Sequence, residues 1–458
     1  MGGSDRAQTV LRCTAMIPDP HAAAGAAADA ADTRARPLVS RTVALDVADL
    51  PTDLLELLPR TGAMAWVRRG DGLVAWGELM RVETTGLRRF ADAEATWRSI
   101  VSHAVIRDEV RVPGTGPIAF GSFAFADGSP AGGALIVPRV VVGRRGDTAW
   151  VTTLDAGAIR APGPDVLVTQ PTPQSPGAVT FDDGALSRQG WQGAVAQAVG
   201  EIRAGRLDKV VLARDVVART ELPLDPRWVL HRLAADYGSC WTFMVDNLLG
   251  ATPELLVRSD KGLVTSRVLA GTIRRTGDDD ADLARAAILA HSSKDLEEHE
   301  YAVSSLTDAL GPFCSSTNVP ETPFVLHLAN VLHLATDVTG VLSTDGVHPA
   351  PSSLHLAAAL HPTAAVAGTP TATACELIGR LEAMDRARYA GPVGWLDADG
   401  DGEWGIALRS AALDPADPHR LRLFAGCGIV AASVPSAELA ESEAKLEPMR
   451  HALLTPAI

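Results

Sequence analysis

The chain has 458 residues, 47% of them hydrophobic, which is enough to bury a large core. Its formal net charge of −14 argues against nucleic acid as a partner, because phosphate binding requires a basic surface. The same charge provides no long-range attraction for an anionic ligand, so any such ligand must be held by local cations.

Cysteine usage and segment composition predict a soluble, cytoplasmic protein. The five cysteines form no CxxC pair and leave one unmatched, which fits a reducing compartment. The N-terminus has no apolar segment of signal-peptide length, and the Ala/Asp/Gly-rich residues 21–32 predict a flexible leader over residues 1–38. The longest segment without acids, lysine or arginine, residues 350–375, contains prolines, histidines and threonines that argue against a membrane span.

The next part of the chain, residues 39–185, has a β-rich pattern. Apolar runs at 63–67 and 73–76 flank the sequence Arg-Gly-Asp-Gly at 69–72, a hairpin turn signal. Gly146-Asp147 separates two further apolar runs in the same way. We therefore expect successive antiparallel hairpins here.

A helix followed by a strand is predicted at the start of the C-terminal half. Residues 187–204 keep apolar side chains at intervals of three and four, and Gly205 ends the pattern. Lys209 then opens the strand-like run KVVLAR, in which alternation places Lys209 and Val211 on one face. Further on, residues 278–310 have a helical period with a break near Ser292-Ser293, and Ser436 is predicted to cap the last helix.

Residues 324–341 have a strand pattern that places His327 and His333 on one face. Six residues apart on a strand, the two rings lie about 20 Å from each other, too far to bind one metal ion. We interpret both as sheet residues with hydrogen-bonded rings.

Two charged clusters, one near the end of the chain and one between it and Lys209, have helical spacing. Offsets of three and four place the members of each cluster on one helix face. They are Lys294, Asp295 and Glu298 in one cluster, and Glu438, Glu441 and Lys445 in the other. Either cluster alone is explained by a solvated surface, and the alternative is a site for a hard cation such as Mg²⁺.

Seven separated segments, in order and with matching spacing, resemble the chorismate-utilising enzymes and, among them, the isochorismate synthases. The resemblance covers roughly residues 186 to 450. The segments are 209–214 (KVVLAR), 251–255 (ATPEL), 269–272 (LAGT), 293–299 (SKDLEEH), 361–368 (HPTAAVAG), 389–395 (YAGPVGW) and 425–429 (AGCGI), the last followed by Glu441 and Lys445.

The resemblance implies an α/β (α+β) fold, one large chorismate-binding unit with two packed antiparallel β-sheets surrounded by helices and a cleft between them. In this division, residues 39–185 form the β-rich N-terminal part and residues 186–455 the chorismate-binding catalytic region. It also implies the cofactor Mg²⁺, with Glu298 and Glu441 as ligands and Asp295 and Glu438 as outer-shell partners.

The family's substrate-binding positions also have counterparts here. One carboxylate of the substrate would be bound by Tyr389, Arg409 and Lys445, together with backbone N–H groups of a turn at Gly426, Cys427 and Gly428. Cys427 stands where the family often has alanine. Gly271 and Thr272 match further contacts.

Two residues match the family's catalytic acid and base. Glu254 would protonate the departing C4 hydroxyl, which requires a raised pKa, and Lys209 would take a proton from the attacking water, which requires a lowered one. The ordinary alternatives are a solvated turn acid for Glu254 and a strand-edge charge for Lys209.

Small differences favour water as the nucleophile. Lys209 stands where ammonia-using anthranilate synthase has glutamine, and Ala270 stands where aminodeoxychorismate synthase carries a nucleophilic lysine. Ala365 stands where relatives that also eliminate pyruvate tend to have threonine, which favours isochorismate as the final product.

The alternatives are a salicylate synthase and a non-catalytic chorismate-binding subunit. We expect a monomer that acts on a small-molecule substrate without an obligatory amidotransferase subunit, and whose product feeds menaquinone or siderophore biosynthesis.

Overall fold

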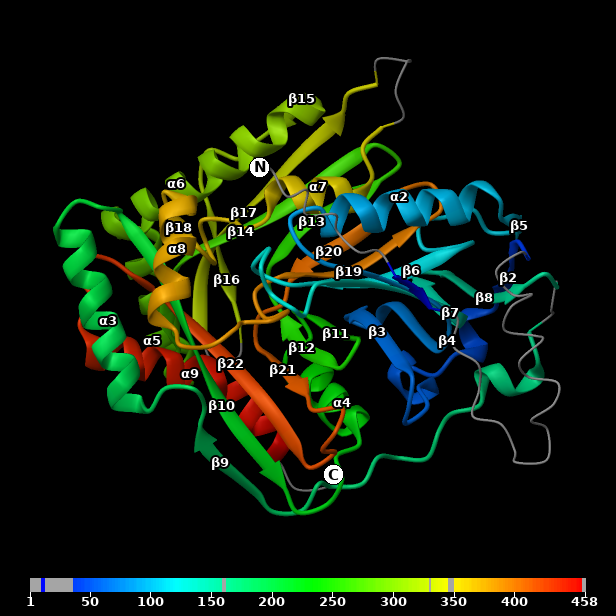
Figure 1. Cartoon of the computed structure of the whole chain (residues 1–458), viewed down its shortest axis with the longest axis horizontal. Coiled ribbons are helices and arrows are strands. Elements are labelled where there is room, and N and C mark those ends of the chain that lie inside the picture. Colours follow the sequence, from blue (N-terminus) through cyan, green and yellow to red (C-terminus); the bar gives the residue numbers. More distant parts are fainter. Residues whose placement is uncertain (1–9, 13–35, 159–161, 329–330, 345–349, 455–458) are drawn as a thin grey trace, which may run out of the picture.

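The computed structural model describes residues 10–12, 36–158, 162–328, 331–344 and 350–454, without the side chains of 10–12, 164, 165, 294 and 298. Helices and runs of consecutive strands form one body (Figure 1). The helices are α2 (Arg89–Ser102), α3 (Arg188–Arg203), α4 (Pro226–Asp236), α5 (Asp279–Ala290), α6 (Ser293–Leu310), α7 (Ser353–Leu360), α8 (Thr371–Leu381) and α9 (Pro435–Leu454).

The strands of the N-terminal part are β1 (Val10–Arg12), β2 (Leu38–Leu45), β3 (Ala63–Arg68), β4 (Asp71–Thr84), β5 (Val105–Asp108), β6 (Ile118–Phe123), β7 (Gly133–Arg145), β8 (Thr148–Ala156) and β9 (Val179–Asp183). Those of the C-terminal part are β10 (Lys209–Thr220), β11 (Trp241–Val245), β12 (Leu248–Thr252), β13 (Leu255–Asp260), β14 (Leu263–Arg274), β15 (Cys314–Asn318), β16 (Phe324–His327), β17 (Val331–Leu342), β18 (Gly368–Thr369), β19 (Pro392–Asp397), β20 (Gly402–Ile406), β21 (Ser410–Leu413) and β22 (Arg420–Ile429).

The strand ladders are antiparallel apart from the parallel pair β2–β5, which confirms the predicted mixed class with a large antiparallel sheet. One run of neighbours is β9–β10–β22–β21–β12–β11–β3–β4–β7. A second run is β6–β19–β20–β13–β14–β17. The two runs are continuous because β6 also pairs with β7. The two sheets that the sequence analysis predicted are therefore joined by hydrogen-bonded strand pairs.

Both halves of the chain contribute to these ladders. β3 pairs with β11, and β6 pairs with β19. The predicted leader, residues 1–38, lies mostly outside the described residues, but Val10–Arg12 forms β1 along β4.

The local signals in the N-terminal part are confirmed. β3 and β4 form a hairpin whose turn residues, Arg69 and Gly70, have φ of 52° and 82°. Positive φ at both positions is the turn geometry that matches the twist of two antiparallel strands. The pair Gly146-Asp147 likewise separates β7 from β8.

The helix predictions are largely confirmed. Ser187 caps α3 by accepting a hydrogen bond from the Gly190 N–H, and Ser292 caps α6 at the predicted break after α5. Ser436 is not the cap of α9, because the helix already begins at Pro435, a residue whose fixed φ suits a first helical position.

The prediction of a single strand over residues 324–341 is wrong, because the chain reverses direction within this segment. The segment forms two antiparallel strands, β16 and β17, with Leu326 opposite His333. His327 is exposed whereas His333 is buried, so the two histidines do not share an environment.

Gly426, Cys427 and Gly428 do not form a turn. They lie within β22 and pair with Ala213, Leu212 and Val211 of β10. A long antiparallel partner keeps this segment extended, although glycine is usually weak in a strand.

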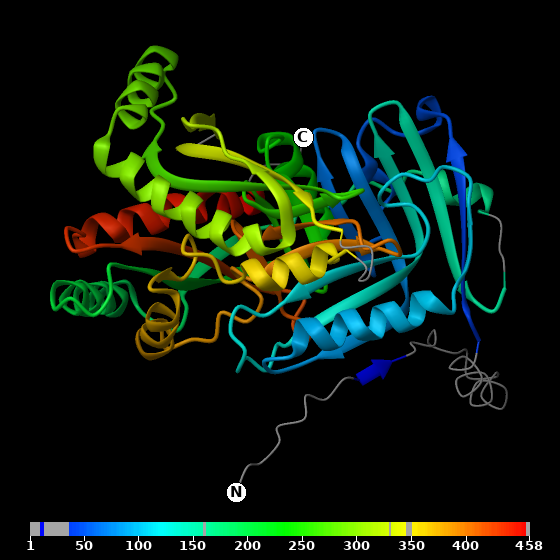
Figure 2. The same cartoon turned by 90° about the horizontal axis from the view of Figure 1, so that it is seen from above.

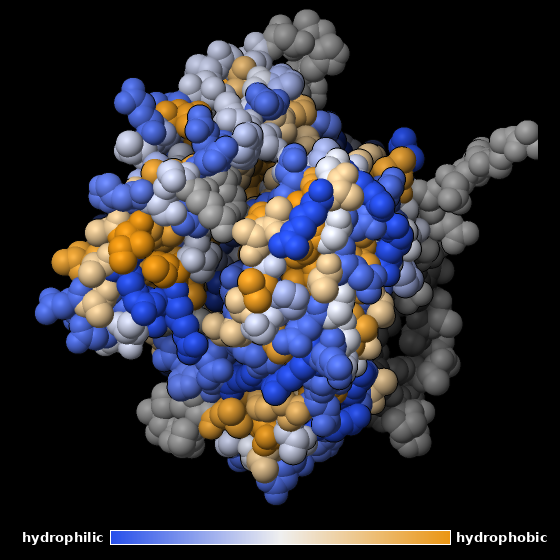
Figure 3. Space-filling view, turned by 90° about the vertical axis from the view of Figure 1, so that its left-hand side faces the viewer, coloured by the Kyte–Doolittle hydropathy of each residue, from blue (hydrophilic) through white to orange (hydrophobic). Residues whose placement is uncertain are grey.

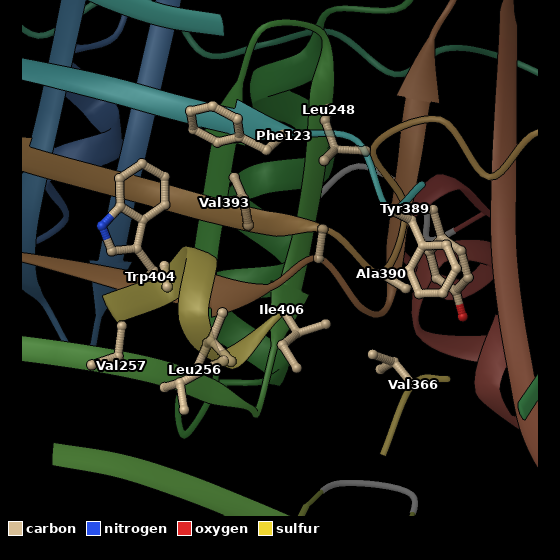
Figure 4. Packing of buried hydrophobic residues seen from close by; sticks show 14 of the residues in the cluster. Phe123, Leu248, Leu256, Val257, Val366, Tyr389, Ala390, Val393, Trp404 and Ile406 are labelled. Carbon is tan, nitrogen blue, oxygen red and sulfur yellow. The ribbon is translucent and has the colours of Figure 1, made fainter. Parts of the chain in front are cut away.

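The core supports the region that carries the predicted site. In Figure 4 a continuous hydrophobic cluster extends from Val257 and Trp404 to Val366, Tyr389 and Ala390. β10 and β22 run side by side (Figure 1), and α9 packs against β22 while α6 packs against β14.

Figure 2 shows α5 and α6 at the end of the molecule opposite the strands β2 and β8. On the face drawn in Figure 3, small hydrophobic patches are interspersed among hydrophilic residues. Among the helices that the structure describes, none combines the length and apolar character needed to cross a membrane.

Candidate active site

A cavity of about 250 Å³, here called the central cavity, brings together residues from distant parts of the chain. β10, β14, β22, α6 and α9 all contribute to its wall. The predicted residues that line it are Lys209, Glu254, Gly271, Thr272, Asp295, Ala365, Tyr389, Arg409, Gly426, Gly428, Glu438, Glu441 and Lys445. Glu298 lies on α6, but its side chain is outside the described set, and Cys427 does not line the cavity.

Glu254 is a buried acid between β12 and β13. Its side chain is 6% exposed, and its N–H donates to Thr252 Oγ1 at 3.3 Å. Burial raises the pKa of its carboxyl to about 8, against the opposing effect of the charges on Lys209 and Lys445. A carboxyl with this pKa carries its proton at neutral pH and can act as a general acid.

Lys209 enters the cavity at the first residue of β10, where it pairs with Thr369 of β18. A buried ion pair that was not predicted holds this strand in place, and its arginine also lines the cavity. Arg386 forms an ion pair with Glu382. Its guanidinium also donates hydrogen bonds to the Val366 carbonyl at 2.9 Å and to the Val211 carbonyl at 2.8 Å. The pair therefore joins β10 to the segment before β18, and so fixes the strand that carries Lys209.

A hydroxyl group and a positively charged group, those of Tyr389 and Arg409, line the central cavity near β22. Tyr389 stacks on Phe424 with ring centroids 5.0 Å apart, and a side chain at Gly426 would approach the Tyr389 hydroxyl to 3.3 Å. Arg409 is 8% exposed and has φ of 49°, a conformation that its surroundings must hold in place. The absence of a side chain at Gly426 therefore leaves space for the Tyr389 hydroxyl. Gly426 itself lies in a strand and not in the turn that was predicted to bind a carboxylate through backbone N–H groups.

A bulge in β14 shapes the opposite wall. The register with β17 shifts between Ala270 and Thr272, and Gly271 has φ of 77°. A Cβ at Gly271 would lie 3.2 Å from Cβ of Asp295. Because a bulge re-aims the neighbouring side chains, Ala270, Gly271 and Thr272 all reach the cavity from one strand.

His333 is a cavity residue that the sequence reasoning missed. Its Nδ1 lies 2.9 Å from Thr272 Oγ1, and within the described part of the chain its buried Nε2 has no hydrogen-bond partner. Burial, with the charges of Arg409 and Lys445, lowers the pKa of its imidazole to about 3, so the ring is neutral. In the sequence, the signal for a site residue here was a single histidine within the apolar run VLHLA. Its position opposite the LAGT segment appears only in the structure.

The predicted face of α9 carries an ion pair at the cavity. Lys445 Nζ lies 2.7 Å from Glu441 Oε1 and donates to the Gly426 carbonyl at 3.0 Å. Burial alone would raise the pKa of Glu441, but Lys445 outweighs it and the carboxyl has a lowered pKa. Burial alone would lower the pKa of Lys445, but the ion pair with Glu441 opposes it and the net shift is upward. Both groups are therefore charged at neutral pH.

The carboxylates of α9 fit a hard cation. One ligand atom from each of Glu438, Glu441 and Cys427 lies within 4.8 Å of the others. Mg²⁺ binds through one or two carboxylates and keeps several waters, which suits two neighbouring acids with Asp295 across the cavity.

Cys427 lies behind this site. It is fully buried, and its thiol donates to the Glu438 carbonyl at 3.3 Å. Burial raises the pKa of the thiol, so it stays protonated. The sequence predicted that the backbone N–H of Cys427 contacts substrate from a turn, whereas the residue lies in β22 opposite Leu212, and strand alternation turns its side chain away from the central cavity.

A family model described as chorismate binding enzyme matches residues 25–454. The chain belongs to the chorismate-binding enzyme family. The salicylate biosynthesis isochorismate synthase of Pseudomonas aeruginosa is 34% identical over 425 residues, 86% of this chain and 85% of that one. Isochorismate synthase DhbC of Bacillus subtilis is 40% identical over 274 residues, 57% of this chain and 67% of its own.

Among solved structures, the menaquinone-specific isochorismate synthase MenF of Escherichia coli superposes with a TM-score of 0.76 at 25% identity. The match covers 91% of this chain and 95% of that one. The fold of this member of the chorismate-binding enzyme family is thus shared along nearly the whole chain.

Proposed function

We propose that the protein is an isochorismate synthase, an isomerase that converts chorismate to isochorismate. The observation that carries the proposal is that Lys209 and the protonated Glu254 border one cavity. The similarity to three isochorismate synthases supports the same activity.

The reaction requires one proton to be removed and one to be supplied. Lys209 accepts a proton from a water molecule as that water forms a bond to C2 of the ring. Glu254 donates its proton to the C4 hydroxyl, which leaves as water while the ring double bond shifts. One water enters and one departs, so atoms and charge balance.

Local cations hold the dianionic substrate in a protein whose net charge is −14. Arg409 and Lys445 line the central cavity together with the Tyr389 hydroxyl. Charge-assisted hydrogen bonds from these groups to a carboxylate are stronger than neutral ones. Their position opposite Gly271 and Thr272 orients the ring between the acid and the base.

Glu441 and Glu298 would hold Mg²⁺, with Asp295 and Glu438 as outer-shell partners. The ion, when bound, neutralises the ring carboxylate and so supplies electrostatic stabilisation. The protein residues then determine where that carboxylate lies.

Replacing Glu441 by alanine should raise the Mg²⁺ concentration needed for half-maximal activity at least about tenfold, because the variant loses a ligand. Titration calorimetry with Mg²⁺ alone measures the same loss without turnover. Glu447→Ala is the matched control, since Glu447 is an exposed residue of the same helix that does not line the cavity. An unchanged Mg²⁺ titration for Glu441→Ala would remove this residue from the metal site.

Salicylate synthase is the second candidate, favoured by one observation. The neutral His333 beside Thr272 adds a further hydrogen-bonding group to the cavity, which could orient the enolpyruvyl group for elimination of pyruvate. Ala365, also in the cavity, weighs against it, because a methyl group cannot hydrogen-bond to the ether of the substrate.

Ala365→Thr should therefore increase pyruvate release from chorismate. The added hydroxyl would lie beside the enolpyruvyl group and could hydrogen-bond to its ether oxygen. A coupled assay for pyruvate, run on the variant and the unchanged protein, measures the gain. No added pyruvate would mean that another residue controls the elimination.

Incubation with chorismate and Mg²⁺, without ammonia, tests the main proposal directly. Isochorismate as the sole product supports it, whereas salicylate with pyruvate supports the second candidate. Unchanged chorismate would instead favour a non-catalytic chorismate-binding subunit. The names of the relatives, which include a menaquinone-specific and a salicylate-biosynthesis enzyme, support a product that enters menaquinone or salicylate biosynthesis.

A further inference from the structure

A second cavity, here called the side cavity, lies next to the central one. Its volume is about 300 Å³, and Glu254 and Ala365 border both cavities. One face of α6 forms a wall at intervals of three and four residues, with Ala302, Ser305, Leu306 and Ala309. Ser305 is exposed, so the side cavity reaches the surface beside α6.

The side cavity contains groups that suit water. His361 Nε2 lies 3.0 Å from the Phe125 carbonyl, so Nε2 is the donor of a neutral ring and Nδ1 is an acceptor. Neither the buried Nδ1 of His361 nor the buried Oγ1 of Thr363 has a hydrogen-bond partner within the described residues. Ordered water typically satisfies such groups, and the volume accommodates several water molecules.

The proposed reaction requires a route by which the water released beside Glu254 can leave. The C4 hydroxyl departs as water beside Glu254, while the ring occupies the central cavity between Glu254 and Lys209. The ring then separates the new water molecule from the Lys209 side. Since Glu254 also borders the side cavity, a path that does not pass the ring begins at the acid itself.

We propose that the side cavity is a water site and exit route, which receives the water released at C4 and connects Glu254 with solvent along α6. This inference rests on the proposed isochorismate synthase activity. The C4–O bond breaks, and the oxygen leaves as water with the proton from Glu254. Before the next turnover, Lys209 releases to solvent the proton that it took from the attacking water, and Glu254 regains a proton from solvent through water in the side cavity.

Blocking the surface end tests the route. Ser305→Trp places a large side chain at the opening and should lower kcat about tenfold with little change in KM, because water release becomes slow after substrate has bound. Ser304→Trp is the matched control, since Ser304 is the exposed neighbour on α6 that does not line the cavity. Ser305→Ala should retain the original rate, because bulk rather than the hydroxyl is responsible.

An isotope measurement separates a blocked route from general damage to the fold. Chorismate carrying ¹⁸O at the C4 hydroxyl is converted in ordinary water, and the label left in the unreacted chorismate is measured at equal isochorismate formation. Chorismate loses its label when the reverse reaction adds an unlabelled water at C4. If Ser305→Trp retains the released water in the side cavity, chorismate incubated with this variant should lose less label per isochorismate formed than chorismate incubated with Ser304→Trp. Ala302→Leu, deeper on the same face of α6, should have the same effect.

Wild-type rates and wild-type label loss in both Ser305→Trp and Ala302→Leu would overturn the exit route. Failure of the unchanged protein to form isochorismate would instead overturn the proposed function. The two outcomes are distinguishable because the first requires an active parent protein.

Discussion

Lys209→Ala should lose about a hundredfold to ten-thousandfold in kcat, the usual contribution of a general base. The variant should fold normally, because β10 is held by its ladder with β22 and by the Arg386 contact to the Val211 carbonyl. Turnover of chorismate, together with thermal unfolding, measures both expectations.

Lys209→Arg is the informative control for this variant. Arginine keeps the positive charge but cannot lose its proton near neutral pH, so activity should stay low. Full turnover by either variant would exclude Lys209 as the base.

Glu254→Gln should cause a loss of similar size, because glutamine resembles the protonated acid in shape but has no acidic proton. In the unchanged protein, activity should fall as the pH rises through about 8, where the carboxyl loses its proton. A pH profile of kcat/KM reports this limb for the free enzyme. Retention of the alkaline limb in a still active Glu254→Gln would assign it to another group.

The same carboxyl makes stability depend on pH. Its folded-state pKa of about 8 lies above the ordinary value of 4.5, so the folded state binds the proton more tightly than the unfolded state. The free energy of unfolding should therefore decrease as the pH rises from 4.5 to about 8, and Glu254→Gln should abolish this part of the slope. Urea unfolding at several pH values measures it, with Glu254→Asp as the variant that keeps a titrating group.

Local structure was predictable wherever a short-range signal determined it. The hairpin of β3 and β4 follows from the sequence of its turn, and the break between α5 and α6 follows from the capping serine. The prediction failed for residues 324–341, because β-forming residues look alike whether the chain continues or reverses direction.

The site was predictable to a different extent. The order and spacing of the motifs selected Lys209, Glu254, Glu441 and Lys445, and the central cavity contains all four. The motifs did not select His333 or the ion pair of Arg386 and Glu382. Their importance depends on neighbours that lie far away in the chain.

The sequence by itself determined the class of fold, the family and the types of side chain available for acid, base and cation binding, because these are written in residue identity and spacing. Only the tertiary structure decided that Gly426 and Cys427 lie in a strand, with the buried thiol against the Glu438 carbonyl of α9. Only the tertiary structure raises the pKa of Glu254, because the removal of a carboxyl from water depends on chain segments that meet only in the folded protein.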